Sequence, residues 1–474
     1  MQQQPLWQRS GAEISAGIRA REFNCVDAIE SAVARMRKRN GAINAVTLDL
    51  GDEALETAAE LDRRLARGEV PGALVGVPVT IKDNIDVAGQ RTPNGLVALK
   101  DVIAPDDAPL VAHLRRAGAV IIGRTNTPEF SMRAFTDNPL YGLTRNPWST
   151  KHNCGGSSGG AGASLAAGIG AIAHGNDIGG SIRIPSYHCG VCGLKPTAGR
   201  VPTYAGARAP DVGVIGRFMS VQGPLARSVA DLRTALAVMA QPDARDPWHV
   251  PVPFAFSPLE RPIKVALVRG VPGAETHPAV TAALDDAAAL LRDAGYAVEA
   301  ADPPDPNATR ALGLRLLATE LSHNIGGQIA QMVSPIVQRY FAETFELGGV
   351  TTQVGEYLKV LGERTRWMRE WEQFLARYPL ALTPLSLVPP YPVDYDLGGI
   401  DVLRKMWTDL SFSITVNAMS LPAAVVPIRL DAGLPIGVQL IGRRFREDTI
   451  LDAAASIERA VGVFAAKLWA KEAA

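Results

Sequence analysis

Apolar residues recur along the chain with two spacings, one typical of amphipathic helices and the other of buried strands. Ala, Leu and Ile at helical spacing among charged residues predict helices at 11–40, 52–67, 107–117, 278–294 and from about 447. Short apolar runs predict buried strands at 76–81, 119–122, 263–268, 296–299, 422–428 and 436–441. Helices that alternate with buried strands favour βαβ units, so the pattern predicts an α/β fold with a largely parallel or mixed sheet.

Two long segments break this alternation. Residues 308–377 predict a mostly helical region that carries much of the aromatic content. Residues 153–200 contain thirteen glycines, which indicate tight turns and close approach of the backbone to another group. A flexible linker is the alternative for such a segment. Aliphatic residues are interleaved with the glycines, however, and this is not typical of a linker.

Length and charge narrow the class of protein. A chain of 474 residues suits one large α/β domain, or a large domain carrying a smaller inserted layer. The 48 Lys and Arg residues balance 48 Asp and Glu residues, so the basic excess of a nucleic-acid binder is missing. No basic patch followed by an apolar run begins the chain, and residues 161–174 are too short and small-sided to span a bilayer. We therefore expect a cytoplasmic protein with no membrane span and no nucleic-acid partner.

The four cysteines are too few for a disulfide scaffold in a chain of this length. Cys189 and Cys192 form a single Cys-x-x-Cys pair without further ligands at matched spacing, which favours packing of two thiols over a metal site. No phosphate-binding loop, dinucleotide-binding glycine motif or His-Glu-x-x-His pair occurs. The sequence therefore predicts neither a metal nor an organic cofactor.

Residues 156–160 match the Gly-x-Ser-x-Gly nucleophile elbow of α/β-hydrolases. That elbow follows an apolar strand, whereas residues 146–154 are largely polar. The elbow also requires a later Asp and His, and His249, His277 and His323 stand in no recognisable context. This motif is the weaker of two candidates for serine chemistry.

Lys82 and Ser181 form the stronger candidate. A serine nucleophile can be served by a neutral lysine amine, and burial lowers the pKa of an amine. Lys82 directly follows the apolar run that ends at Ile81, although a surface lysine opening a loop is the ordinary alternative. Gly179 and Gly180 precede Ser181 and let successive backbone N–H groups converge on an oxyanion. A glycine turn with an N-capping serine is the alternative there.

Taken together, several segments resemble the amidase signature family. The closest matches are 76–86 (Gly-Val-Pro-Val-Thr-Ile-Lys-Asp-Asn-Ile-Asp), 155–160, 175–183 and 189–200, with further support at 124–130, 144–148, 223–229 and 433–442. Lys82 precedes Ser157 by 75 residues and Ser157 precedes Ser181 by 24, and both separations fit the family. The resemblance is clearest over 74–232 and 411–447, and it is weak or absent over 240–410.

This resemblance implies one amidase-signature domain over residues 1–474, with a mixed β-sheet core flanked by helices on both sides. The catalytic core would cover about 74–232 and 411–460, and the mostly helical segment 308–377 would shape the substrate pocket. The resemblance assigns Ser181 as nucleophile, Ser157 as a bridging serine held by a cis peptide bond, and Lys82 as general base. It assigns the oxyanion hole to the backbone N–H groups of Ile178, Gly179, Gly180 and Ser181.

Supporting roles are expected for Ser158, Asp177 and Arg183, the last two through buried polar contacts that shape the loop. The family usually has Thr or Ser where this chain has Asn176. Asn still offers a hydrogen-bonding side chain, so we expect the chemistry to be retained. Five residues of the variable segments are candidates for an apolar or aryl pocket, or else ordinary core or lid residues: Met132, Phe135, Tyr141, Tyr204 and Phe218.

The function implied is hydrolysis of a small-molecule carboxylic amide through an acyl-enzyme intermediate, with side activity on esters or carbamates. A homodimer is one assembly consistent with the resemblance. Three alternatives stay open: the glutamine-hydrolysing component of a tRNA-dependent amidotransferase, a carbamate or aryl-amide (anilide) hydrolase, and a catalytically silent binding protein on the same scaffold. The first is disfavoured because 331–370 contains no Glu-Val-Lys-Arg-Arg-Ile-like stretch.

Overall fold

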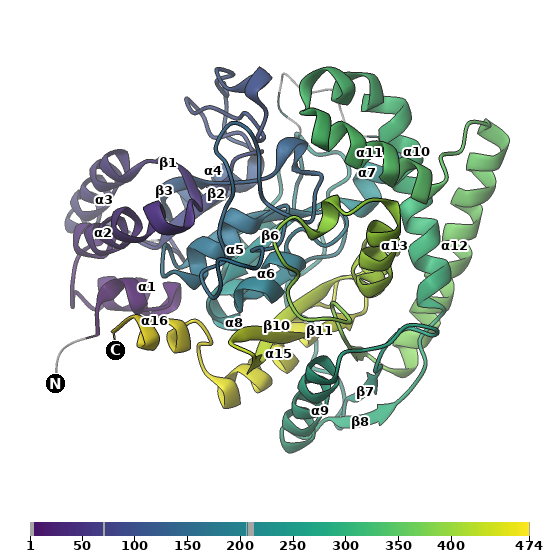
Figure 1. The fold of residues 1–474 in the computed structure, drawn as a ribbon. Coiled ribbons are helices and arrows are strands. Elements are labelled where there is room, and N and C mark those ends of the chain that lie inside the picture. Colours follow the sequence, from purple (N-terminus) through teal and green to yellow (C-terminus); the bar gives the residue numbers. More distant parts are fainter. Residues whose placement is uncertain (1–3, 70–71, 205, 207–212, 474) are drawn as a thin grey trace.

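A mixed β-sheet of eleven strands runs through the part of the chain that the computed structural model describes, residues 4–69, 72–204, 206 and 213–473 (Figure 1). The strands lie side by side in the order β1-β3-β2-β4-β6-β5-β10-β11-β9-β7-β8. Strand β2 is parallel to β3 and β4, and β7 is parallel to β8 and β9, whereas the other neighbours are antiparallel. The bounds are β1 Val46–Asp49, β2 Pro78–Lys82, β3 Val120–Thr125, β4 Ile172–Asp177, β5 Cys192–Lys195, β6 Val221–Ala226, β7 Lys264–Leu267, β8 Ala297–Ala300, β9 Leu380–Thr383, β10 Ala423–Asp431 and β11 Leu434–Gly442.

Helices cover both faces of this sheet. Four of them pack one against the next: α4 (Pro109–Arg116), α8 (Val229–Met239), α15 (Glu447–Val461) and α9 (Pro278–Asp293). Two others, α5 (Gly159–Ala166) and α6 (Arg183–Cys189), pack against each other. Gln439 of β11 bonds to Arg183 of α6, whereas Gly442 lies against Ile450 of α15. Three positions separate Gln439 from Gly442, so they lie on opposite faces of the strand, and α6 and α15 do too. The expected α/β class is confirmed.

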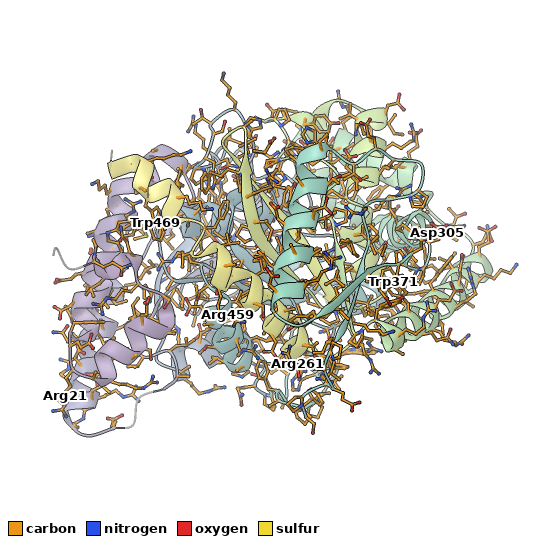
Figure 2. The ribbon with its side chains drawn as sticks, turned by 90° about the horizontal axis from the view of Figure 1, so that it is seen from below. Arg21, Arg261, Asp305, Trp371, Arg459 and Trp469 are labelled. Carbon is orange, nitrogen blue, oxygen red and sulfur yellow. The ribbon has the colours of Figure 1, made fainter. Side chains whose placement is uncertain are left out.

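The N-terminal helices α1 (Gly11–Arg19), α2 (Cys25–Ile43) and α3 (Gly51–Ala66) lie near the C-terminal helix α16 (Ala466–Ala473) (Figure 1). The helical structure predicted over 11–40 is present, but it is divided into two helices between Arg19 and Cys25. Arg21 has a φ of 60°, which ends α1, and Asn24 caps α2 by accepting from the N–H of Asp27. Trp469 of α16 packs edge-on to Trp7, with ring centroids 5.0 Å apart (Figure 2).

A second helical group stands on the side of the molecule opposite α1–α3 (Figure 1). It comprises α7 (Val214–Met219), α10 (Pro306–Met332), α11 (Pro335–Gly348), α12 (Val354–Arg377), α13 (Ile400–Asp409) and α14 (Ser411–Ala418). Helix α10 packs against α11, α12 and α14. Buried residues of α12, such as Val360, Trp367 and Trp371, recur at helical spacing, so one face of this helix packs inward. None of the described helices is both long and apolar enough to cross a membrane.

Candidate active site

The ends of β2 and β4 bring Lys82 next to Asn176. Because these strands are parallel neighbours, their carboxyl ends lie at the same edge of the sheet. The side chain of Lys82 is fully buried. Its Nζ lies 2.7 Å from Ser157 Oγ and donates to Asn176 Oδ1 at 2.6 Å. The amine is therefore held between one hydroxyl and one amide oxygen.

Burial lowers the pKa of the Lys82 amine well below its ordinary value, because the charged form loses its hydration. The negative charge of Asp177 opposes this shift only in part. Arg124 of β3 donates to the carbonyl oxygens of Lys82 and Ile85, which fixes the chain where β2 ends. The site thus presents a positioned amine that favours its neutral, basic form.

The glycine-rich segment before α5 carries Ser157 and Ser158. The peptide bond between Gly156 and Ser157 is cis, as the family resemblance implies, and Ser157 is buried. The N–H of Ser158 donates to the carbonyl oxygen of Ser181 at 3.1 Å, and its hydroxyl donates to the carbonyl oxygen of Asn176 at 3.4 Å. These bonds hold the two serine-bearing segments and the end of β4 side by side.

Asp177 organises the loop that leads to Ser181. Its carboxylate accepts from the N–H groups of Gly180 and Ile182, at 2.8 and 3.1 Å, and forms a buried ion pair with Arg183 at 2.9 Å. Asn417 of α14 donates to the same carboxylate at 2.9 Å. Burial would raise the pKa of Asp177, but the charge and hydrogen bonds of Arg183 outweigh it and lower the pKa to about 2. The loop is therefore wound around a permanent carboxylate.

Because Asp177 engages one of them, the four backbone donors of the predicted oxyanion hole are not equally available. The N–H of Gly180 is used by Asp177, as described above. Across the described part of the chain, the N–H groups of Ile178, Gly179 and Ser181 have no hydrogen-bond acceptor. They are the three members of the predicted set that remain available to a bound oxygen.

Gly180 occupies a position that only glycine fits. Its φ of 129° lies in a region that L side chains rarely adopt, and an added Cβ would lie 2.1 Å from the hydroxyl of Ser413. That hydroxyl donates to the carbonyl oxygen of Gly179 at 2.9 Å. The glycine therefore lets α14 approach the loop from behind.

Half-buried Ser181 lies at the wall of a narrow apolar cavity of about 40 Å³. Residues on three helices complete this wall: Leu314, Leu317, Ala318 and Leu321 of α10, Tyr340 and Phe341 of α11, and Trp407 of α13. None of these seven residues was predicted individually from the sequence. Those of α10 and α11 lie within 308–377, the segment expected to shape the pocket, but no chemical motif marks their individual positions, and Trp407 lies outside that segment.

The five predicted pocket residues fall in different places. Met132 lines the apolar cavity beside Ser181. Phe135 is buried in the core, with its ring 6.1 Å from that of Tyr391. The carbonyl of Tyr141 accepts a bond from the side chain of Asn44.

The other two aromatic residues lie nearer to β6. Phe218 packs edge-on to Trp248, with ring centroids 5.9 Å apart, and beneath the guanidinium of Arg364. Tyr204 lines a separate, more polar cavity of about 560 Å³. Asn176 also lines this polar cavity, so it extends to the residue that bonds Lys82.

Comparison with known proteins places the site in context. Residues 27–451 match the family model described as Amidase. The chain is 44% identical over 466 residues to an indoleacetamide hydrolase of Bradyrhizobium diazoefficiens, covering 98% of this chain and 89% of that protein. It is 33% identical over 482 residues to a component of the glutamyl-tRNA(Gln) amidotransferase of Moorella thermoacetica, covering 96% and 97%.

Two solved structures of amide hydrolases have the same fold as this chain. A bacterial aryl acylamidase superposes with a TM-score of 0.84 at 27% identity, covering 98% of this chain and 99% of that one. A 6-aminohexanoate cyclic dimer hydrolase complexed with substrate superposes with a TM-score of 0.82 at 27% identity, covering 96% and 98%. The protein is a hydrolase of non-peptide amide C–N bonds that acts on a small-molecule amide. The chain belongs to the amidase signature family.

Proposed function

We propose that this amidase hydrolyses the primary amide of an arylacetamide of the indoleacetamide type, with Ser181 as nucleophile. The observation that carries the proposal is the position of Ser181 at the wall of an apolar, partly aromatic cavity, on a loop bonded to the Ser157 segment. Tyr340, Phe341 and Trp407 supply flat apolar surfaces suited to a ring. The indoleacetamide hydrolases at 44% and 45% identity support the same class of substrate.

The proposed reaction begins with a proton relay. Neutral Lys82 accepts the proton of Ser157, which accepts the proton of Ser181 as the Ser181 oxygen attacks the carbonyl carbon. The 2.7 Å contact between Lys82 and Ser157 and the lowered pKa of the amine support this direction of transfer. The oxyanion would accept bonds from the N–H groups of Ile178, Gly179 and Ser181, which have no acceptor among the described residues.

The relay then runs backwards. The proton returns through Ser157 to the amide nitrogen, the C–N bond breaks, and ammonia leaves an ester on Ser181. Water loses a proton to Lys82 through Ser157 and attacks the ester carbonyl. The bond between the carbonyl carbon and the Ser181 oxygen then breaks, and the proton returns through Ser157 to that oxygen as the carboxylic acid leaves. Protonation of the nitrogen is essential because an amide anion is a poor leaving group, so esters and carbamates with better leaving groups are expected side substrates.

The test is hydrolysis of a substrate panel by the wild type and Ser181→Ala. The panel holds indoleacetamide, phenylacetamide, an aliphatic amide, an anilide, a carbamate and glutamine. We expect the wild type to release ammonia fastest from the two arylacetamides, and Ser181→Ala to lose at least about 10³-fold in kcat. Full turnover by Ser181→Ala would overturn the assignment of Ser181 as nucleophile. Faster turnover of the aliphatic amide than of the arylacetamides would overturn the proposed substrate class.

Glutamine hydrolysis as part of an amidotransferase is the second candidate, because several relatives at 31–34% identity are components of glutamyl-tRNA(Gln) amidotransferases. The apolar wall formed by Leu314, Leu317 and Trp407 favours an aryl substrate over a polar one. Turnover of glutamine by the isolated protein that exceeds turnover of indoleacetamide would reverse this order.

Two further expectations remain predictions: association as a homodimer and a cytoplasmic location. Analytical ultracentrifugation of the purified protein at several concentrations tests the first, and fractionation of the producing cells tests the second.

A further inference from the structure

We infer that Asn176 is a positioning residue, whose side-chain oxygen takes one N–H of Lys82 and thereby keeps the amine's lone pair available to Ser157. This inference rests on the proposed relay. Asn176 lies near the end of β4, one position before Asp177, and its Oδ1 lies 2.6 Å from Lys82 Nζ.

The direction of each hydrogen bond of Lys82 decides which way its lone pair faces. A neutral amine has two N–H groups and one lone pair, and Lys82 acts as a base only when the lone pair faces Ser157. The contact with Ser157 can run either way, because a hydroxyl both donates and accepts. The contact with Asn176 Oδ1 can run only from the amine, because a carbonyl oxygen cannot donate. Asn176 therefore fixes one N–H and keeps the lone pair from turning toward β4.

A threonine or serine hydroxyl could accept the same N–H, but it would not fix the direction of the bond. It could donate its own proton to the Lys82 lone pair, which would compete with Ser157 for the base. The Nδ2 of Asn176 has no hydrogen-bond partner in the described ranges, and the residue lines the polar cavity. The amide thus gives its oxygen to Lys82, while no protein bond constrains its nitrogen.

Other ionisable groups surround the amine and must be distinguished from Asn176. Asp83 follows Lys82 on the chain, and burial raises the pKa of Asp83 to about 7. Arg124 lies on the neighbouring β3, and β4 contributes His174, whose pKa burial lowers to about 3, and the permanent carboxylate of Asp177. Helix α5 carries no ionisable side chain. Because Asp83 can titrate near neutral pH, the test relies on shifts between variants rather than on one absolute pH value.

The experiment measures kcat/KM for indoleacetamide against pH in the wild type, Asn176→Asp, Asn176→Val and Asn176→Thr. Activity rises with pH as Lys82 loses its proton. A carboxylate at 176 stabilises the ammonium, so the acid limb of Asn176→Asp should move up by about one to three pH units. Asn176→Val removes the acceptor, so its acid limb should move down by about one unit and kcat should fall about 10- to 100-fold.

Thr and Val have nearly the same shape and differ in the hydroxyl, so they form a matched pair. Thr retains an acceptor, and we expect Asn176→Thr to keep at least about tenfold more kcat than Asn176→Val. Thr92→Val, which lines the same polar cavity, serves as control and should leave the acid limb in place. Thermal unfolding of each protein separates loss of fold from loss of positioning.

Opposite shifts in Asn176→Asp and Asn176→Val support the inference. The inference would be overturned if the acid limbs of Asn176→Asp and Asn176→Val did not move or moved in the same direction. Equal kcat in Asn176→Thr and Asn176→Val would also overturn it. Such a result would not affect the Ser181→Ala experiment, so the role of Asn176 could be rejected while the proposed relay is retained. Full activity in Ser181→Ala would remove both.

Discussion

At the residue scale, the site depends on polar side chains placed where water cannot reach them. Lys82 and Asp177 are both buried, yet their pKa values move away from their usual ranges for different reasons. Lys82 forms no ion pair among the described residues, so burial favours its neutral form, whereas Arg183 keeps Asp177 charged. Burial alone therefore does not set the charge of a group, and the immediate partner decides it.

Lys82→Met should separate catalysis from stability. Loss of the base should lower kcat about 10²- to 10⁴-fold. Burial of the amine favours the deprotonated state only in the folded protein, so the unfolded chain binds one more proton between the two pKa values, and wild-type stability rises with pH there. Lys82→Met should lack this rise and be at least as stable as the wild type at neutral pH. Urea unfolding of both proteins from pH 6 to 10 measures the free energy of unfolding. A Lys82→Met protein that is less stable than the wild type at every pH would contradict this expectation.

At the element scale, strand ends and the loop after β4 do most of the positioning. The sequence predicted that β2 would deliver Lys82 and that Gly179 and Gly180 would shape the turn before Ser181, because apolar runs and paired glycines are local signals. The engagement of the Gly180 N–H by Asp177 was not predictable, because it depends on where the carboxylate lies after folding. The break at Arg21 was also missed, because nothing in the sequence marks an arginine that adopts a positive φ.

Acid should destabilise the loop from 177 to 183 by protonating Asp177. The folded pKa is about 2 and lies below the unfolded value of about 3.9, so the carboxylate stabilises the fold above pH 4 and loses that effect as the pH falls toward 2. Asp177→Asn should cost about 3–5 kcal/mol at neutral pH, because Arg183 is left buried without its counter-charge. Denaturation of both proteins from pH 7 to 2 should show the difference shrinking below pH 4. A difference that stays constant to pH 2 would contradict the assignment.

At the scale of the whole molecule, the site is assembled from distant parts of the chain. Antiparallel pairing of β5 with β10 joins the segment that carries the serines to the segment after 410. Helix α14 then reaches the loop through Ser413 and Asn417. The resemblance to the amidase signature family covers both parts, whereas the cavity wall comes mainly from α10, α11 and α13. Those helices carry apolar spacing without a motif, so the sequence predicted the relay but left the shape of the pocket open.

Asn417→Ala should show this long-range support. The amide of Asn417 donates to the carboxylate and carbonyl of Asp177 and to the carbonyl of Met219, and its oxygen accepts from Arg183. We expect a loss of about 1–3 kcal/mol in the free energy of unfolding and a fall of about 10²-fold in kcat, because buried groups lose partners and the loop loosens. Urea unfolding and steady-state kinetics check both values. Unchanged kcat in a destabilised protein would show that the loop keeps its shape without α14.

Complete burial also separates Lys82 from the lysines that solvent reaches. Lys38, Lys100 and Lys151 are exposed, whereas Lys82 and Lys195 are fully enclosed. Acylating reagents and aldehyde-activated supports capture only amines that they can touch, so they should decorate the exterior and leave the folded catalyst working. Tethering to a bead through its amines should therefore yield active immobilised enzyme, while the same treatment of unfolded chains would block the base permanently.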